Sequence, residues 1–512
     1  NTNNRISQGG GQQLSSPLVV PTPAPDLGAI ILYVQTVGDD RTIRGQKINR
    51  DGERLWGDFG NSISTVLTNV DNLSGVPDGN GGAAFVYTAV DITNPFFYNV
   101  VRFQHVNANG DTLLPGEGVV VDSANGEQSF SSMTKSGNNY YVAFIELYDE
   151  INLYYAVRVA KINLDGSQVW LRTIAEGAVN NSTGNRQHVQ LIPASNGGVV
   201  AYWQEYRSDS NNGGQIYAQK VNSDGTIGWT TGGIRLGASA EDQATATATI
   251  TRSGNSYWFA WKDVRNAGVA QIYAQHINDA GQRQLATSGL HVNDMGTNVQ
   301  QDPSVAMDNS NGVYLAWSQY VQAITDTIAD AEIKGVHLSG TGAVLYPNIW
   351  SSPTPQNSGW WVRFTYKQLT PDIAPTVLNA AVGNWQDFRS TGKEELINLY
   401  GQRVSDPSTE IREITNSIVP SDYVLEQNWP NPFNSTTTFK FSLPNQENVK
   451  VIVYDVTGRE VARLLDAKVQ AGTYQVKWFG KNDAGLKVAS GIYFYRLETK
   501  KATLTRKLAL VN

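Results

Sequence analysis

The stretch Ile216–Asn222, with the sequence IYAQKVN, is nearly repeated by Ile272–Asn278, with the sequence IYAQHIN. Five weaker copies of this stretch end at Asn49, Asn107, Asn163, Ser339 and Ser405. Successive copies lie 56 to 66 residues apart, longer than the ~40 to 50 residues of common propeller repeats. Such a repeat indicates a modular fold in which every copy forms one structural unit.

A glycine follows the last residue of the copy by three positions in six of the seven repeats. These glycines are Gly52, Gly110, Gly166, Gly225, Gly281 and Gly342. Glycine, and Asn or Asp beside it, tolerate the positive φ of a tight hairpin, so we expect a two-residue turn. Four residues later comes an apolar, usually aromatic side chain that we expect to pack between units: Trp56, Leu114, Trp170, Trp229, Leu285 or Tyr346.

A second apolar strand precedes each copy, for example Tyr141–Phe144, Trp258–Trp261 and Tyr314–Trp317. Each period therefore holds about four strands, the content of a propeller blade. We predict an all-β fold with a β-propeller of seven four-stranded blades over residues 17–419. The last repeat is degenerate, which leaves six or eight blades open. A β-solenoid is less favoured because its coils are shorter.

The C-terminal part contains a different series of motifs. In chain order they are Asn431, Pro432, Phe433 and Asn434, then Tyr454, Asp455 and Gly458, then Gly491 and Tyr493. This order over residues 423–512 resembles the type A C-terminal sorting domain of proteins exported by type IX secretion, although Ser435 stands where that family often has proline. Residues 420–422 are expected to be a linker.

The resemblance implies an immunoglobulin-like β-sandwich with the type IX machinery as a partner. It also implies passage through the periplasm of a Gram-negative bacterium to the outer cell surface or the medium. The residues support the fold independently, because Phe439, Phe441 and Leu443 alternate with polar residues as in half-buried strands.

Composition excludes several classes of protein. Thirty-nine Lys and Arg against 46 Asp and Glu give a net charge of −7, which is no electrostatic footprint for nucleic acid or an anionic membrane. Without cysteine there are no disulfides or thiolate metal sites. No apolar run approaches the ~18 to 20 residues of a membrane-spanning helix. The chain begins at Asn1 without methionine, as after removal of a signal peptide, but such a start is not diagnostic.

The most suggestive polar pattern is Trp-x-acid-x-Arg. It supplies three acid and arginine pairs: Glu205 with Arg207, Asp263 with Arg265, and Asp387 with Arg389. Side chains two apart on a strand share one face, so each pair could line a ligand site. The alternative is a repeated ion pair that fixes loop geometry, and we favour it because the motif follows the repeat.

Histidines supply no metal site in this pattern. His105, His276 and His337 occupy one slot of three different repeats and would lie far apart, while His188 and His291 lack partners at ligand spacing. Phosphate-loop, zinc and EF-hand motifs are also absent. We therefore predict no metal, no cofactor and no catalytic residues.

These observations lead us to expect a non-enzymatic surface protein with a structural or adhesive role. Residues 1–16 are polar and are expected to form an extended arm, which either reaches a neighbouring copy in a filament or folds back along its own propeller. The alternatives are a surface carbohydrate-binding module and a sialidase-like glycoside hydrolase. The adjacent Asp224 and Gly225 do not match the spacing of a sialidase aspartate box.

Overall fold

The structure is a computed structural model of the chain. It describes residues 13–22, 28–37, 40–49, 52–64, 70–91, 97–123, 126–151, 154–178, 186–206, 213–238, 242–251, 254–266, 268–292, 299–308, 311–320, 331–346, 372–375, 380–387, 398–405, 409–414, 420–469, 471–482 and 487–511.

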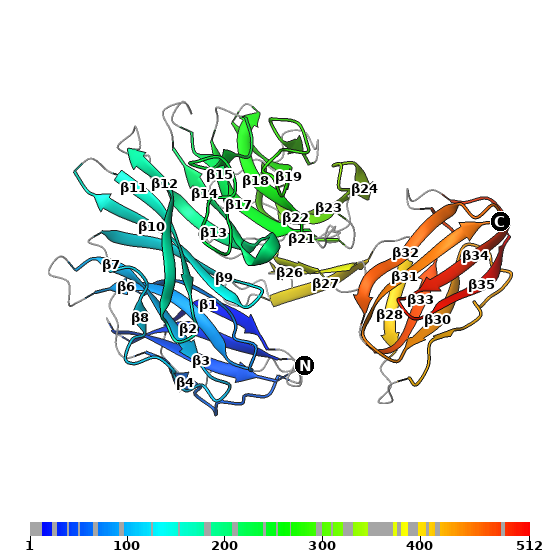
Figure 1. The fold of residues 1–512 in the computed structure, drawn as a ribbon, viewed down its shortest axis with the longest axis horizontal. Helices are drawn as coiled ribbons and strands as arrows, with labels where there is room; N and C mark the ends of the chain where they lie inside the picture. Colours follow the sequence, from blue (N-terminus) through cyan, green and yellow to red (C-terminus); the bar gives the residue numbers. More distant parts are fainter. Residues whose placement is uncertain are drawn as a thin grey trace, which may run out of the picture.

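The described chain is all-β, apart from one short 3₁₀ turn, η1 (Ser195–Gly197). Seven small antiparallel sheets follow one another along the chain, and an immunoglobulin-like sandwich follows them (Figure 1). Six of the seven sheets have four strands and the seventh has three, each in simple chain order. The repeat seen in the sequence therefore corresponds to one sheet, and the arrangement is propeller-like. No helix in the described ranges is long and apolar enough to cross a membrane.

The strands are best compared by their position in each sheet. The first strands are β1 (Gln13–Pro21), β5 (Asp71–Pro77), β9 (Glu127–Ser136), β13 (Gln187–Pro193), β17 (Gln243–Ile250), β21 (Val299–Met307) and β25 (Asp372–Pro375). The second strands are β2 (Ala29–Val37), β6 (Ala83–Val90), β10 (Asn139–Asp149), β14 (Val199–Glu205), β18 (Ser256–Asn266), β22 (Val313–Tyr320) and β26 (Ala380–Asp387). The third strands, which carry the repeated motif, are β3 (Asp40–Ile48), β7 (Asn99–Val106), β11 (Tyr154–Ile162), β15 (Gln215–Val221), β19 (Val269–Asn278), β23 (Ala331–Leu338) and β27 (Asn398–Ser405). The fourth strands are β4 (Asn61–Ser62), β8 (Val119–Val120), β12 (Gln168–Ala178), β16 (Ile234–Arg235), β20 (Leu290–His291) and β24 (Val344–Tyr346).

First strands of consecutive sheets contact each other, from β1 with β5 through to β21 with β25. We call them the inner strands. Side chains also link them: the Ser74 Oγ accepts a 2.9 Å hydrogen bond from the Met133 N–H, and the Ser132 Oγ accepts one of 3.2 Å from the Leu191 N–H. The sheets are therefore joined along their inner strands.

The glycine turns lie between the third and fourth strands. In each, the glycine N–H donates to the carbonyl of the Asn or Ser three residues earlier, for example Gly225 to Asn222 at 2.9 Å. The six glycines have φ between 81° and 88°. The Asn222 N–H bonds to the Thr226 carbonyl at 2.9 Å, so three residues form the loop. The predicted two-residue turn is thus one residue too short, because a type I turn followed by a left-handed glycine needs positive φ only at the glycine.

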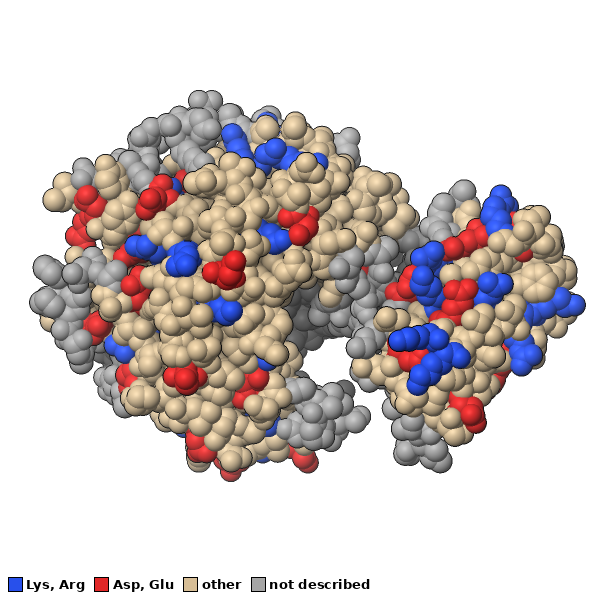
Figure 2. Space-filling model, viewed as in Figure 1, with Lys and Arg blue, Asp and Glu red and all other residues tan. Residues whose placement is uncertain are grey.

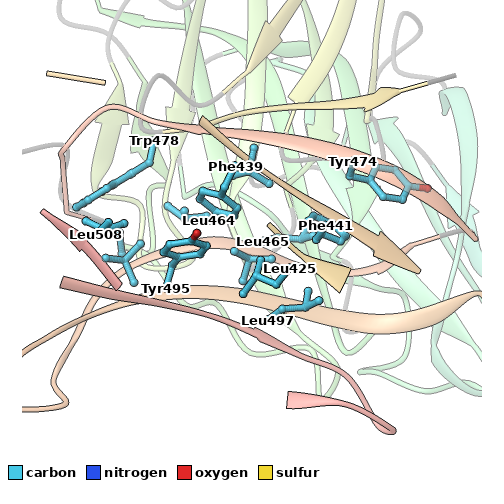
Figure 3. Close-up of a cluster of buried hydrophobic side chains, with 14 of the residues drawn as sticks. Leu425, Phe439, Phe441, Leu464, Leu465, Tyr474, Trp478, Tyr495, Leu497 and Leu508 are labelled. Carbon is cyan, nitrogen blue, oxygen red and sulfur yellow. The ribbon is translucent and has the colours of Figure 1, made fainter. Parts of the chain in front are cut away.

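The sandwich has two four-stranded sheets. One contains β28 (Thr409–Ile414), β33 (Gly472–Trp478), β30 (Thr437–Leu443) and β29 (Val424–Leu425); the other contains β32 (Glu460–Val469), β31 (Glu447–Asp455), β34 (Gly491–Glu498) and β35 (Thr503–Leu510). Aromatic and aliphatic side chains of both sheets fill the space between them, as Figure 3 shows for Phe439 and Tyr495, whose ring centroids are 4.3 Å apart.

Both predicted domain boundaries differ from the strand pairing. β28 pairs with β33 from Thr409↔Trp478 to Ile414↔Thr473, so the sandwich takes a strand from residues assigned by sequence to the propeller. At the other end, residues 13–16 belong to β1, where Gln13 pairs with Thr36. That part of the predicted arm lies along its own sheet, and residues 1–12 lie outside the described residues. Both boundaries depend on pairing between strands that are distant in the chain, which the local sequence does not indicate.

Candidate functional site

An irregularity recurs in the inner strands of the first six sheets. In each, two residues face one residue of the second strand, which is a β-bulge, as between Gln187 and Gln190 of β13. Four bulges hold a residue other than glycine at positive φ: Asn72 (56°), Phe130 (52°), His188 (53°) and Asp302 (51°). We call these four the bulge residues.

Such backbone is strained for a side chain with a Cβ, above all for Phe130. Strain of this kind persists where the surroundings impose it, and it concentrates at binding and active sites. Bulges next to such sites redirect side chains. The repeated bulge therefore marks the inner strands as the candidate functional site.

The bulge residues combine an aromatic ring, an imidazole, an amide and a carboxyl group. Phe130 and His188 come from adjacent sheets, and their ring centroids lie 4.9 Å apart. The Ser131 hydroxyl beside Phe130 donates a 3.1 Å hydrogen bond to the Asn72 carbonyl. Equivalent positions of neighbouring sheets thus meet one another rather than acting separately.

Burial changes the titration of two bulge residues. It lowers the pKa of the His188 imidazole, which favours the neutral ring. It raises the pKa of the Asp302 carboxyl, although Lys262 partly offsets the effect. Near neutral pH the site thus offers a neutral imidazole and a carboxyl that holds its proton to a higher pH than usual.

Each bulge faces one buried aromatic side chain on the second strand. These side chains are Tyr33, Tyr87, Phe144, Trp203, Trp261 and Trp317. In the fourth and fifth sheets this aromatic residue is the tryptophan of the Trp-x-acid motif. That motif therefore lies directly behind the bulges.

The acids of the Trp-x-acid motif, Glu205 and Asp263, are held within the sheets by hydrogen bonds and ion pairs. The Trp203 indole N–H donates to the Glu205 carboxylate at 2.7 Å, and Glu205 also pairs with Arg186 at 2.7 Å. Asp263 accepts from Trp261 at 3.2 Å and from Gln243 at 2.9 Å. Both carboxylates are fully buried and have several donors, which is the behaviour of a structural network rather than of a ligand site.

Of the three predicted acid and arginine pairs, the described residues include both members of one. Arg265 does contact Asp263, and its guanidinium lies 3.9 Å from the Tyr273 ring centroid. Arg207 and Arg389 lie outside the described residues, as does the side chain of Asp387. Arg186, which no local motif marks, also pairs with Glu205, because it lies at the start of the inner strand.

Hydrogen bonds to a glutamine of the inner strand also connect the fifth and sixth sheets to the sheet before. The Gln243 side-chain oxygen accepts from the Ile216 N–H at 3.2 Å, and Gln300 accepts from the Ile272 N–H at 3.0 Å. Sequence reasoning missed the bulge residues. The available signal was a glutamine two positions before the bulge in the third, fifth and sixth sheets: Gln128, Gln243 and Gln300.

His105, His276 and His337 lie where the repeat places them, in three separate sheets. His105 bonds to Asp78 at 3.0 Å and His337 to Asp308 at 2.9 Å, whereas His276 bonds to the Ser256 hydroxyl at 2.8 Å. His291 bonds to Gln271 at 2.9 Å. Within the described part of the chain, no three His, Cys, Asp or Glu side chains form a group that could hold a metal ion.

The residues predicted to form a sorting-domain motif lie along the outer edge of β35 near its C-terminal end. The Asn431 side-chain oxygen accepts from the Ala509 N–H at 2.9 Å, and the Phe433 backbone bonds to Ala509 at 2.9 Å and Val511 at 2.8 Å. Pro432 follows a cis peptide, and Asn434 accepts from the Thr436 N–H at 2.8 Å. These contacts occupy the free edge at the end of β35, at Ala509 and Val511, and so hinder pairing with another chain there.

The other motif residues shape the second sheet of the sandwich. The Asp455 carboxylate accepts from the Thr457 and Arg459 N–H groups at 2.9 and 3.1 Å, in a turn closed by Gly458 with φ 81°. The Tyr454 ring lies 4.8 Å from the Arg496 guanidinium. Gly491 begins β34, and two residues later the buried Tyr493 donates to the Ala489 carbonyl at 2.7 Å.

Known proteins are similar to this chain in two ways: a family model matches part of the sandwich, and solved structures share the fold at low identity. Residues 429–503 match the FlgD Ig-like domain family, which agrees with the sandwich. No curated protein is similar to the chain at a significant level. The chain is also similar to solved structures at low identity.

Three solved structures illustrate this similarity. A Dyadobacter fermentans protein of unknown function has 10% identity and a TM-score of 0.37, over 65% of this chain and 96% of its own. A PL25 ulvan lyase has 9% identity and a TM-score of 0.45, over 76% and 93%. Bacillus subtilis levansucrase has 12% identity and a TM-score of 0.32, over 54% and 86%.

The prediction that this protein is not an enzyme is wrong, since its fold is compatible with an enzymatic function. It rested on regular repeats without a catalytic motif, yet the similar structures include a polysaccharide lyase, levansucrases and a family-43 glycoside hydrolase. Identities this low show the fold alone and assign no activity. The chain is thus an all-β protein with propeller-like sheets and an Ig-like C-terminal domain.

Proposed function

We propose that this protein is an exported carbohydrate-active protein that holds a neutral glycan against its inner strands. The seven sheets close into a propeller, which brings the bulge residues around one mouth. The observation that carries the proposal is the set of strained bulge residues, three of them in adjacent sheets, with Phe130 and His188 in ring contact.

The chemistry of these side chains suits a sugar. A sugar ring has an apolar face that packs on an aromatic ring and hydroxyls that bond to amide, imidazole and carboxyl groups. Ligand sites commonly combine aromatic surface with a few such polar groups. Phe130 supplies the first element, and Asn72, His188 and Asp302 supply the second.

The distribution of charge favours an uncharged glycan. Of the 39 Lys and Arg and 46 Asp and Glu, 13 and 8 belong to residues 420–512. This leaves 26 against 38, a net charge of −12, for residues 1–419. Figure 2 shows the contrast, with Lys and Arg crowded on the sandwich. A surface of this sign repels acidic polysaccharides at low ionic strength.

Glycan binding is tested by affinity electrophoresis in gels that contain soluble glucan, xylan or mannan. Wild type should be retarded by at least one of them, and Phe130→Ala should lose about tenfold in affinity. Phe97→Ala is the matched control, since this side chain is 63% exposed and lies outside the bulges. Retardation by none of the glycans, or an equal loss in both variants, would refute the proposal.

Cleavage of the bound glycan is a second candidate, favoured by the raised pKa of the Asp302 carboxyl. A carboxyl whose pKa is raised holds its proton to a higher pH and is better suited to act as a general acid than an ordinary carboxyl. New reducing ends or unsaturated products should then appear with wild type. They should be lost with Asp302→Asn, whereas glycan retardation persists.

Export through the type IX system is proposed from the sorting-domain resemblance of residues 423–512. The covered edge of β35 supports it, because a secreted sandwich must avoid pairing with other chains. Removal of residues 477–512 should trap the protein in the periplasm of its host. Normal surface display of the shortened chain would contradict this role.

A further inference from the structure

The aromatic residue behind the bulge normally gives its polar hydrogen to a partner. Tyr87 donates its hydroxyl to the Glu117 carbonyl at 2.6 Å, and Trp203 and Trp261 donate to the acids two residues further on. In these three sheets the aromatic residue at this position therefore donates a hydrogen bond within the protein. The aromatic residues at this position in two other sheets do not.

In the sixth sheet the indole N–H of Trp317 has no hydrogen-bond partner among the residues that the structure describes, although the side chain is 1% exposed. The acid of the motif is replaced there by Gln319, whose side-chain oxygen accepts from Gln300 at 3.4 Å. In the first sheet the hydroxyl of Tyr33 is likewise buried without a partner.

Buried donors are almost always paired, so two orphans at one repeated position need an explanation. In the sixth sheet the carboxyl group stands at the bulge instead, as Asp302, in the two-residue bulge that faces Trp317 in the register. A carboxyl and an unsatisfied N–H on facing residues suit a hydroxyl that both accepts and donates a hydrogen bond.

We propose that Trp317 and Tyr33 are specificity residues of the glycan site, and that each donates its hydrogen to a sugar oxygen when ligand binds. In the sixth sheet the same sugar hydroxyl donates to Asp302. The inference rests on the proposed function and adds the first and sixth sheets to those that contact the glycan.

The test compares Trp317→Phe with Trp261→Phe, which remove the same atoms from equivalent positions of neighbouring sheets. Trp261→Phe takes a donor from the buried Asp263 and should lower the melting temperature. Trp317→Phe removes an unpaired donor, so its melting temperature without glycan should be clearly higher than that of Trp261→Phe. Its affinity for glucan, xylan or mannan should fall about tenfold. Tyr33→Phe keeps its ring and should behave like Trp317→Phe.

The outcomes separate this inference from the proposed function. If Phe130→Ala loses binding while Trp317→Phe and Tyr33→Phe keep it, the inference is overturned and the glycan site stands. If Trp317→Phe is as unstable as Trp261→Phe, with unchanged affinity, an internal water satisfies the indole and the inference again falls. If wild type binds none of the three glycans, both proposals fail.

Discussion

The indole of Trp229 lies against Gly281 of the following sheet. A Cβ built on Gly281 would come within 2.8 Å of the ring, and the Trp229 N–H donates a 3.0 Å hydrogen bond to the carbonyl of Asp279 in the same turn. Trp56 with Gly110 and Trp170 with Gly225 repeat this contact. The glycine of one repeat thus receives the aromatic residue of the repeat before it, as the sequence predicted for packing between units.

Gly281→Ala should therefore destabilise the protein for two reasons, backbone strain at φ 82° and overlap with Trp229. Gly254→Ala provides the control, because Gly254 ends a similar turn of the same sheet at φ 73° with no atom within 4 Å of its Cβ. We expect a loss of about 1 kcal/mol at Gly254 and about 3 kcal/mol at Gly281. Urea unfolding monitored by tryptophan fluorescence measures both, and equal losses would contradict the packing role.

Lys220 links two sheets through Asp279, with a 2.7 Å ion pair. Burial alone would raise the pKa of Asp279, but hydrogen bonds from Lys220, Ser195 and Tyr257 outweigh it and lower the pKa. A lowered carboxyl pKa stabilises the fold above the unfolded value of 3.8, and this contribution disappears as the pH falls through the folded value.

Lys220→Met should cost about 1 to 3 kcal/mol at pH 7, less than a fully buried pair because the Asp279 side chain is 36% exposed. The difference from wild type should shrink below about pH 4, the region of the carboxyl pKa. Lys161→Met is the control, because its amine bonds to the Ser223 carbonyl, which does not titrate. Melting temperatures from pH 7 to pH 3 provide the measurement. A pH-independent difference for Lys220→Met would argue against the ion pair.

Phe130 allows the cost of the bulge to be measured. Phe130→Ala and Phe130→Gly both remove the ring that packs on His188, but only glycine relaxes the backbone at φ 52°. The glycine variant should be more stable than the alanine variant by about 1 kcal/mol. Differential scanning calorimetry decides the matter. Equal stabilities would mean that the left-handed conformation is not strained.

Phe433 joins the sorting-domain motif to the sandwich core. Its ring is buried, 5.6 Å from that of Trp478, and its backbone bonds to the strand edge at Ala509. Phe433→Ala should weaken the sandwich by about 3 to 5 kcal/mol. Ile492→Ala, at a side chain that is 40% exposed, should cost less than about 1 kcal/mol.

Hydrogen exchange of the peptide that covers residues 503–511 measures the protection of β35 directly. Exchange in Phe433→Ala should be much faster than in wild type, and exchange in Ile492→Ala should be nearly unchanged. Full protection in Phe433→Ala would show that the motif does not hold the edge of β35.

The sequence by itself determined the features that repeat locally. The Asn-to-Gly spacing marks the turn because only a few residues tolerate positive φ, and apolar runs mark the strands because each must bury a face. The seven units, the contact of Trp229 with the next turn and the Ig-like character of residues 423–512 were all predictable in this way.

Only the tertiary structure decided which residues form the site. A bulge is a mismatch between two strands, so it appears when Gln187 and Gln190 are paired with a partner and not in the run of residues around His188. The same holds for β28, whose edge position depends on β33, and for Trp317, whose missing acceptor is visible only beside Trp203 and Trp261. Pairing and buried donors depend on neighbours distant in the chain, and local sequence carries no record of them.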